Sequence, residues 1–178
     1  ASYLVGYRYA LAGIAQAVGV DIGTTATPSY QDLSFKVNSG NTKCGKFTTF
    51  GILATSSISI SGGNAGSLFG GKDGNDLDSK IGILGVNHFK QLNTKSYLSS
   101  SIGLNYSKTD QTNYDSDRVT STSFARDESN VAKSSYNIAT TFHSKINAKT
   151  FVKIGLQNEI IGLNLYYRTK QSIDADWL

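Results

Sequence analysis

Hydrophobic and polar residues alternate along much of this chain. In residues 29–38, Leu33, Phe35 and Val37 are separated by polar side chains, and after a turn at residues 39–45 the alternation resumes and continues to Ile60. A period of two places successive side chains on opposite faces of an extended strand. Strands of soluble domains usually have about 5 to 6 residues, whereas a tilted strand needs about 9 to 11 residues to cross a bilayer. The length of the second segment therefore favours strands that cross a membrane.

Five further segments show the same alternation, so the pattern predicts seven strands. The additional segments lie at about residues 3–10, 81–89, 98–106, 136–146 and 151–167. In the last segment the apolar positions change from even to odd residue numbers near Ile160. Because a slip of one residue exchanges the two faces of a strand, we expect a bulge or an exit from the bilayer near Ile160.

The connections between these strands alternate between short and long. The short ones lie at residues 39–45, 91–95 and 147–149, and the long ones at 10–28, 61–77 and 108–130. A short amphipathic helical turn could form at residues 10–18, and residues 119–124 could extend the third long connection as a hairpin. Outer-membrane barrels have short periplasmic turns and long external loops. The chain is therefore predicted to be all-β, an antiparallel up-and-down transmembrane β-barrel with its long loops outside the cell.

The composition of the 178 residues agrees with strands that cross a membrane. No apolar run approaches the roughly 18 residues of a membrane-spanning helix, and 39% of the residues are hydrophobic. In a membrane barrel only alternate residues face lipid, and only a closed barrel pairs every backbone group within the bilayer. The net charge of +4 comes without a basic run, so we expect no binding of nucleic acid. The lone Cys44 excludes an internal disulfide.

Six large apolar side chains in the clearest strands are predicted to face lipid. They are Phe50, Ile52, Ile102, Leu104, Ile138 and Ile154. Seven strands would leave the two ends of the chain on opposite sides of the membrane, whereas single-chain bacterial barrels usually have an even number of strands. We therefore expect these strands to belong to a larger barrel, completed by further strands or by neighbouring chains.

One strand and the turn after it carry a recognisable motif. From residue 29 to residue 47 the chain reads SYQDLSFKVNSGNTKCGKF, and a tyrosine-rich strand precedes it. With residues 2–19, 48–57 and 77–103, which together cover most of the chain, this stretch resembles the barrel region of TonB-dependent receptor-like outer-membrane proteins of the Bacteroidetes type. The matching positions are Gln31, Asp32, Leu33, Ser34, Phe35, Lys36, Lys43, Gly45 and Phe47.

The resemblance implies a location in the bacterial outer membrane, with the membrane lipid as a partner. In such receptors the whole protein takes up a ligand, and a periplasmic TonB partner acts through a plug domain. No plug domain is recognised in this chain. Residues 1–178 are therefore expected to form a single barrel segment that contributes wall to a transporter, without a cofactor.

Two segments could bind phosphate or a cation, but each has a simpler structural interpretation. Residues 66–73, GSLFGGKD, approach a phosphate-binding loop, although Asp73 stands where a hydroxyl should reach magnesium. A group of oxygen-bearing side chains follows at Asp73, Asn75, Asp76 and Asp78. The group lacks the spacing and the terminal glutamate of an EF-hand, so a solvated loop is expected.

The remaining candidates for chemistry lack partners in the sequence. His88 and His143 lie in separate predicted strands, without a cysteine or carboxylate at metal-ligand spacing. Cys44 has no accompanying general base. Asp127 and Glu128 are adjacent and would point to opposite faces of a strand. We expect no catalytic, metal or cofactor site, and therefore no enzyme.

The sequence leaves two other functions open. The chain could be a small stand-alone outer-membrane barrel that acts as an adhesin or a structural surface protein. It could also be a soluble lipocalin-like binding barrel with its apolar positions inside. A soluble barrel would stay monodisperse in buffer without detergent, whereas a membrane barrel would not.

Overall fold

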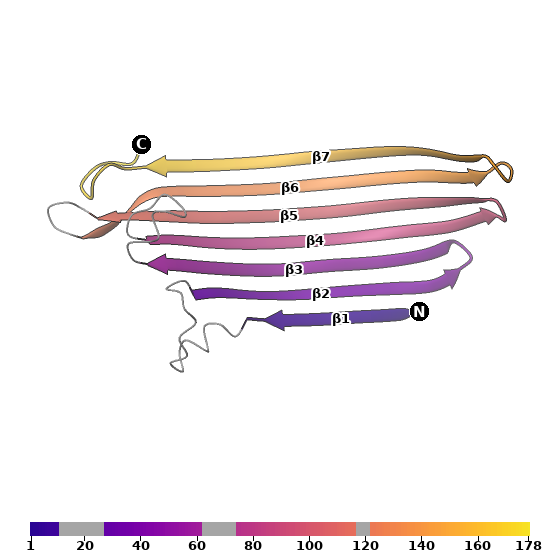
Figure 1. The fold of residues 1–178 in the computed structure, drawn as a ribbon, viewed down its shortest axis with the longest axis horizontal. Helices are drawn as coiled ribbons and strands as arrows, with labels where there is room; N and C mark the ends of the chain where they lie inside the picture. The colour runs from indigo at the N-terminus through magenta and orange to yellow at the C-terminus, as the bar shows by residue number, and fades with distance from the viewer. Residues whose placement is uncertain (11–26, 62–73, 117–121) are drawn as a thin grey trace.

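The computed structural model describes residues 1–10, 27–61, 74–116 and 122–178, and the regular structure in these ranges is entirely β-strand (Figure 1). The strands are β1 (Ser2–Tyr9), β2 (Thr27–Thr42), β3 (Gly45–Ser61), β4 (Gly74–Asn93), β5 (Ser96–Ser116), β6 (Ser123–Lys145) and β7 (Phe151–Thr169). They form one 7-stranded sheet in chain order, and each neighbouring pair is antiparallel. The predicted all-β, antiparallel, up-and-down fold is confirmed, and the sheet is consistent with a region of a β-barrel.

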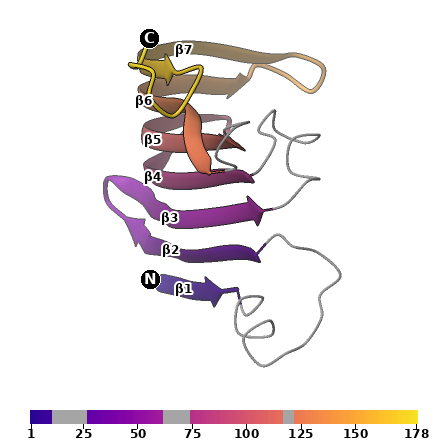
Figure 2. The same ribbon diagram turned by 90° about the vertical axis from the view of Figure 1, so that its left-hand side faces the viewer.

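The sheet is open within the described residues. Its strand order ends at β1 on one side and at β7 on the other, so each of these strands pairs with a single neighbour. In Figure 2, which looks along the strands from one end, the seven strands follow one another in a single layer. Because each strand is antiparallel to the next, the first strand, β1, and the seventh, β7, run in the same direction (Figure 1).

Three tight turns lie together at one end of the sheet, called here the turn end (Figure 1). The opposite end, called the loop end, holds the other ends of the strands and the C-terminus (Figure 1). Asparagine side chains shape two of the turns, because a short side-chain carbonyl can accept from the backbone two or three residues on. Oδ1 of Asn147 accepts from the N–H groups of Lys149 and Thr150, both at 2.8 Å. Oδ1 of Asn93 accepts from the N–H of Lys95 at 2.8 Å.

The third tight turn, between β2 and β3, depends on a glycine. Gly45 has a φ of 119°, a conformation that side chains with a Cβ rarely adopt. A Cβ at this position would also lie 2.5 Å from the carbonyl oxygen of Phe89 on β4. The turn therefore needs glycine both for its backbone conformation and for the close approach of β4.

The strands near the loop end are longer than the sequence pattern predicts. Residues 74–77, 108–116 and 123–130 were expected in loops and instead belong to β4, β5 and β6. Most of their side chains are polar on both faces, but the backbone ladder continues, and polar pairs such as Asn130 with Asp110 support it. The other parts of the expected loops, including the predicted helical turn beyond Ala10, lie outside the described residues.

The bulge predicted near Ile160 is absent from the described part of β7. The pairing of β6 with β7 runs from Phe151 to Thr169 without a shift in register. The change of apolar residues from even to odd positions is therefore a real change of face within one regular strand. The even residues Ile154 and Leu156 and the odd residues Leu163 and Leu165 lie on opposite faces of the sheet.

The sheet has almost no packed core. Among the described residues, the buried hydrophobic side chains are Ala10, Ile60 and Phe124. Large apolar side chains in the middle of the sheet stay exposed, including Ile102 at 54% and Leu156 at 78%. An exposed apolar surface of this extent is typical of a region that contacts lipid or another protein.

Candidate functional site

The register assigns every residue in the strands to one of two faces. Residues directly opposite each other in neighbouring strands share a face, and successive residues alternate. Ile102 on β5 lies opposite Val86 on β4 and Ile138 on β6. We call the face that holds these residues the Ile102 face, and the other the Ser101 face, after the preceding residue of β5.

An uncharged band crosses all seven strands on the Ile102 face. It consists of three successive rows of paired residues. The rows are Tyr3, Val37, Thr49, Val86, Ile102, Ile138 and Asn158; Val5, Phe35, Gly51, Leu84, Leu104, Tyr136 and Ile160; and Tyr7, Leu33, Leu53, Gly82, Tyr106, Ser134 and Gly162. None of these residues is Asp, Glu, Lys or Arg. The band is therefore uncharged, and most of its large apolar side chains are exposed.

The band has the height of a bilayer crossing on the central strands. On β5 the apolar positions of this face extend two rows beyond the band, to Leu98, which lies in a row with Phe142 and Ile154, and they end at Tyr106. That distance is about nine residues, and a tilted strand needs about 9 to 11 residues to cross the hydrocarbon core. On β4 the charge begins at the turn-end limit itself, because Lys90 lies opposite Leu98.

Charged residues fill the next rows of the Ile102 face toward the loop end. Lys80 lies opposite Lys108, Asp78 opposite Asp110, and Glu128 opposite Arg168. The Arg168 side chain donates to Oε2 of Glu128 at 2.5 and 2.8 Å and lies 4.1 Å from the Trp177 ring. Tyrosines at positions 7, 9 and 106 lie at the border between the band and these charges. Tyrosine is enriched at both surfaces of a membrane, because its ring is apolar and its hydroxyl is polar.

The six predicted lipid-facing side chains do not share one face. Ile102, Leu104, Ile138 and Ile154 lie on the Ile102 face, whereas Phe50 and Ile52 lie on the Ser101 face. The grouping is therefore wrong for Phe50 and Ile52. Strand β3 has apolar residues on both faces, so its sequence does not identify the face it shares with Ile102.

Phe50 has a specific neighbour on the Ser101 face. It lies opposite Gly85 on β4, and a Cβ at Gly85 would come within 2.4 Å of the Phe50 ring. The ring thus occupies the space that a side chain at Gly85 would need. The same arrangement occurs on the Ile102 face, where a Cβ at Gly51 would come within 2.5 Å of Phe35.

The Ser101 face is more polar in its middle rows. Nδ2 of Asn105 donates to Oγ of Ser135 at 3.1 Å, and Nε of Arg8 lies 2.7 Å from Oδ1 of Asp32. Near the loop end of β7 this face becomes apolar, at Ile161, Leu163, Leu165 and Tyr167. The two faces therefore differ most across β5 and β6, where one is apolar and the other carries hydroxyl and amide groups.

The residues of the recognised motif occupy structural positions on both faces. Gln31, Leu33 and Phe35 belong to the Ile102 face, and Asp32 and Lys36 to the Ser101 face. Tyr7 donates to Oε1 of Gln31 at 3.0 Å. Gly45 forms the turn, and the Phe47 ring stacks on His88 with centroids 4.5 Å apart. These contacts join β1 to β2 and β3 to β4.

The described part of the chain brings no metal ligands together. It contains no group of three or more His, Cys, Asp or Glu side chains that could hold an ion. A ring nitrogen of His88 lies 2.8 Å from the carbonyl oxygen of Cys44, and His143 stacks on Tyr97 with centroids 4.2 Å apart. Asp76 accepts from the Tyr114 hydroxyl at 3.0 Å. The phosphate-loop-like residues 66–73 lie outside the described residues.

No protein-family model, no curated protein and no solved structure matches this chain. In the ranges that the structure describes, no helix has the length and hydrophobicity to span a membrane. The described residues thus form an open antiparallel sheet that is consistent with a region of a β-barrel. The resemblance to TonB-dependent receptor-like proteins stays a prediction.

Proposed function

We propose that this chain forms part of the wall of a β-barrel in the bacterial outer membrane. The Ile102 face contacts lipid, and the Ser101 face lines a polar interior. The observation that carries this proposal is the uncharged band, which crosses seven strands at one height with charges beyond it. Transmembrane barrels have such an apolar band, roughly 25 Å tall, bordered by aromatic residues.

The energetics of the exposed side chains support lipid contact. Moving a Leu, Ile or Val side chain from water into an apolar phase contributes roughly 1.5 to 3 kcal/mol. Ile102, Leu104 and Ile138 are each at least 41% exposed in the sheet alone. Among the described residues no second layer covers them, so lipid supplies the apolar phase in this proposal.

The strand lengths favour a membrane barrel over a soluble binding barrel. Strands β2 to β7 have from 16 to 23 residues, whereas strands in globular proteins usually have about 3 to 10. A crossing of about 9 to 11 residues leaves several residues of each strand beyond the bilayer. The charged rows near the loop end match that extension into water.

The open edges support a wall segment within a larger barrel. Strands β1 and β7 run in the same direction, so pairing them directly would place one parallel ladder in an otherwise antiparallel sheet. At the outer edge of β7, Thr169 and Leu178 exchange two backbone hydrogen bonds of 2.8 and 3.2 Å. The two bonds have the pattern of a hydrogen-bonded antiparallel pair, so this edge of β7 presents backbone groups that an antiparallel partner can bind.

The wall belongs, in this proposal, to a TonB-dependent transporter-like protein that takes up a ligand. The support for this part is the resemblance of residues 29–47 to such receptors. The polar Ser101 face would border the interior through which the ligand passes. A plug and a periplasmic partner would provide the energy coupling.

The behaviour of the purified chain without detergent tests the membrane assignment. A chain whose Ile102 face contacts lipid should float with vesicles after refolding and should aggregate when detergent is removed. A monodisperse monomer in plain buffer would contradict the proposal and favour the soluble barrel. Size-exclusion chromatography with light scattering distinguishes the two outcomes.

A further inference from the structure

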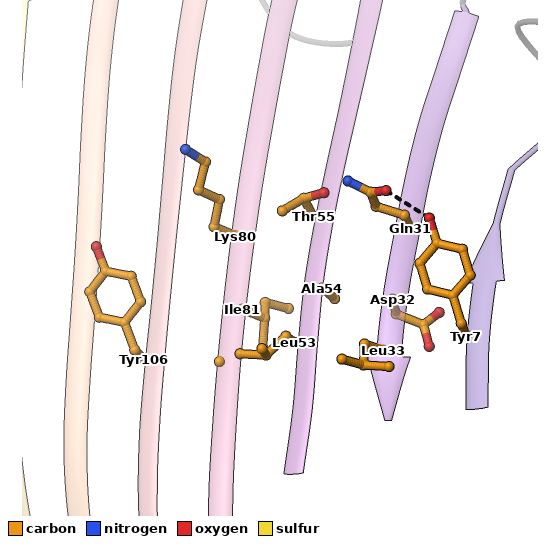
Figure 3. Close-up of a pocket in the computed structure, with 11 residues that line it drawn as sticks. Tyr7, Gln31, Asp32, Leu33, Leu53, Ala54, Thr55, Lys80, Ile81 and Tyr106 are labelled. Atoms are coloured by element: carbon orange, nitrogen blue, oxygen red, sulfur yellow. Dashed lines mark hydrogen bonds between the residues drawn. The ribbon is translucent and has the colours of Figure 1, made fainter. Parts of the chain in front are cut away.

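A groove of about 460 Å³ lies on the Ile102 face where the uncharged band meets the charged rows (Figure 3). Leu33, Leu53 and Tyr106 line its apolar part, and Lys80 lies at its loop end. In Figure 3 the Lys80 ammonium and the hydroxyls of Tyr7 and Tyr106 point toward the same end, away from the two leucines. The groove is thus apolar at one end and has a lysine at the other, and its one acidic lining residue, Asp32, is paired with Arg8.

Gly82 creates the apolar part of the groove. It lies between Leu53 and Tyr106 in the register, and it contributes no side chain to the row. A Cβ added at Gly82 would meet only Leu53 Cδ2, at 3.6 Å, which is an ordinary contact. The space above this residue is therefore open, and a larger side chain would fill it without displacing the backbone.

Lys80 lines the cationic end of the groove, and a second lysine, Lys108, lies beside it without lining the groove. Lys80 and Lys108 are directly opposite across β4 and β5, and like charges in this position destabilise a sheet. Nζ of Lys108 lies 3.0 Å from Oδ2 of Asp110. Within the described ranges, the Lys80 ammonium has no hydrogen bond or ion pair. The carboxylates of Asp78 and Asp110 lie one row further toward the loop end, so the lysines are the charges nearest the band.

We propose that the groove binds an anionic membrane lipid, with one acyl chain over Gly82 and its phosphate between Lys80 and Lys108. This inference depends on the proposed function, because it requires the Ile102 face to lie in the bilayer. The choice of a lipid over a soluble anion follows from the apolar walls below the lysines. An anion at this place pairs with the Lys80 ammonium and offsets its repulsion from Lys108, whose own charge Asp110 already partly compensates.

The test measures lipid preference with a tryptophan beside the groove. Trp177, the single tryptophan of the chain, is replaced by Phe, and Tyr106→Trp places the reporter in the groove. The protein is reconstituted in phosphatidylcholine vesicles that contain, at equal mole fraction, either brominated phosphatidylglycerol or brominated phosphatidylcholine. The reporter Ile138→Trp, in the same band but away from the lysines, is the matched control.

Preferential binding predicts at least about threefold stronger association of phosphatidylglycerol than of phosphatidylcholine at position 106, and no preference at 138. The preference should disappear in Lys80→Gln/Lys108→Gln and in Gly82→Leu. It should persist in Gly103→Leu, where an added Cβ on the other face also has its nearest neighbour at 3.6 Å.

Two results would overturn the inference in different ways. Equal quenching by both lipids at positions 106 and 138 would remove the anionic-lipid site and leave the membrane assignment intact. If neither lipid quenched Ile138→Trp, the result would instead contradict the proposed function. Loss of the preference on addition of soluble glycerol phosphate would show an anion site that does not use the groove, and would also contradict the inference.

Discussion

At the scale of single residues, two aromatic side chains of this sheet each cover a glycine on the neighbouring strand. Phe50 lies over Gly85 on the Ser101 face, and Phe35 lies over Gly51 on the Ile102 face. An aromatic ring opposite a glycine fills the gap in its own row and fixes the pairing of the two strands. The contribution of a residue to the band therefore follows from its cross-strand partner as well as from its own hydrophobicity.

The first prediction concerns charge at the middle of the band. Ile102→Arg should destabilise the protein in vesicles by about 2 to 4 kcal/mol, because a cation at the bilayer midplane loses its hydration. Ser101→Arg, at the adjacent position on the other face, should cost much less. Equilibrium unfolding in urea from preformed vesicles measures both values, and equal costs would contradict the assignment of the faces.

A second prediction concerns the turn glycine. Gly45→Ala should destabilise the sheet by about 1 to 3 kcal/mol, because alanine is strained at a positive φ and its Cβ would press on the Phe89 carbonyl. Gly103→Ala is the control, since its Cβ would meet the nearest atom at 3.6 Å. Thermal unfolding of the two variants should show a clear loss only at Gly45. A comparable loss in both would mean that the turn conformation is not the cause.

At the scale of the strands, the sequence predicts the number of strands, their order and the three tight turns. Period-two alternation is sufficient for this, because it follows from the geometry of any extended strand. It does not predict the strand ends, since polar residues at both faces of β5 and β6 continue the ladder through pairs such as Asn130 with Asp110. Nor does it predict the face of Phe50, because β3 is apolar on both sides and only the register with β4 decides.

The groove residues were not recognisable in the sequence. Lys80, Gly82 and Tyr106 come from two strands and become neighbours only through the β4–β5 register. A lysine in a strand otherwise resembles any solvated charge. The sequence does show a lysine next to the apolar run of each strand, at Lys80 and Lys108. Only the strand pairing shows that these two lysines are neighbours.

The third prediction concerns the sidedness of the strands. The turn end should face the periplasm and the loop end the outside, as in barrels with short periplasmic turns. Cys44 lies exposed in a tight turn and should resist a maleimide coupled to a large polymer when intact cells are treated. In a Cys44→Ser background, Ser123→Cys at the loop end of β6 should react. Labelling of Cys44 alone would reverse the topology.

At the scale of the whole molecule, two features of the sheet need partners that the sheet itself does not provide. The exposed apolar band needs an apolar phase, and the backbone groups at the edges of β1 and β7 need partners, since an unpaired group in lipid costs several kcal/mol. Both needs are met if the sheet is one sector of a larger barrel in a membrane.

The fourth prediction follows from the open edges. In the native membrane the amide groups along the outer edge of β7 should be protected from hydrogen exchange by an antiparallel strand other than β1. Exchange in the protein reconstituted in vesicles, followed by mass spectrometry, measures this protection, and cross-linking from Leu163 identifies the neighbouring strand. A cross-link from β7 to β1 would indicate a closed seven-stranded barrel and contradict the account.

The most direct test of the central claim compares adjacent residues on the two faces. In the protein with Trp177→Phe, tryptophan is introduced at Ile102 or at Ser101, and the protein is refolded into vesicles. If only the Ile102 face contacts hydrocarbon, as proposed, lipid brominated near the middle of its acyl chains should quench Ile102→Trp strongly and Ser101→Trp weakly. Aqueous acrylamide should show the opposite order. Equal quenching at both positions, or stronger lipid quenching at position 101, would contradict the claim that the Ile102 face is the lipid-facing wall.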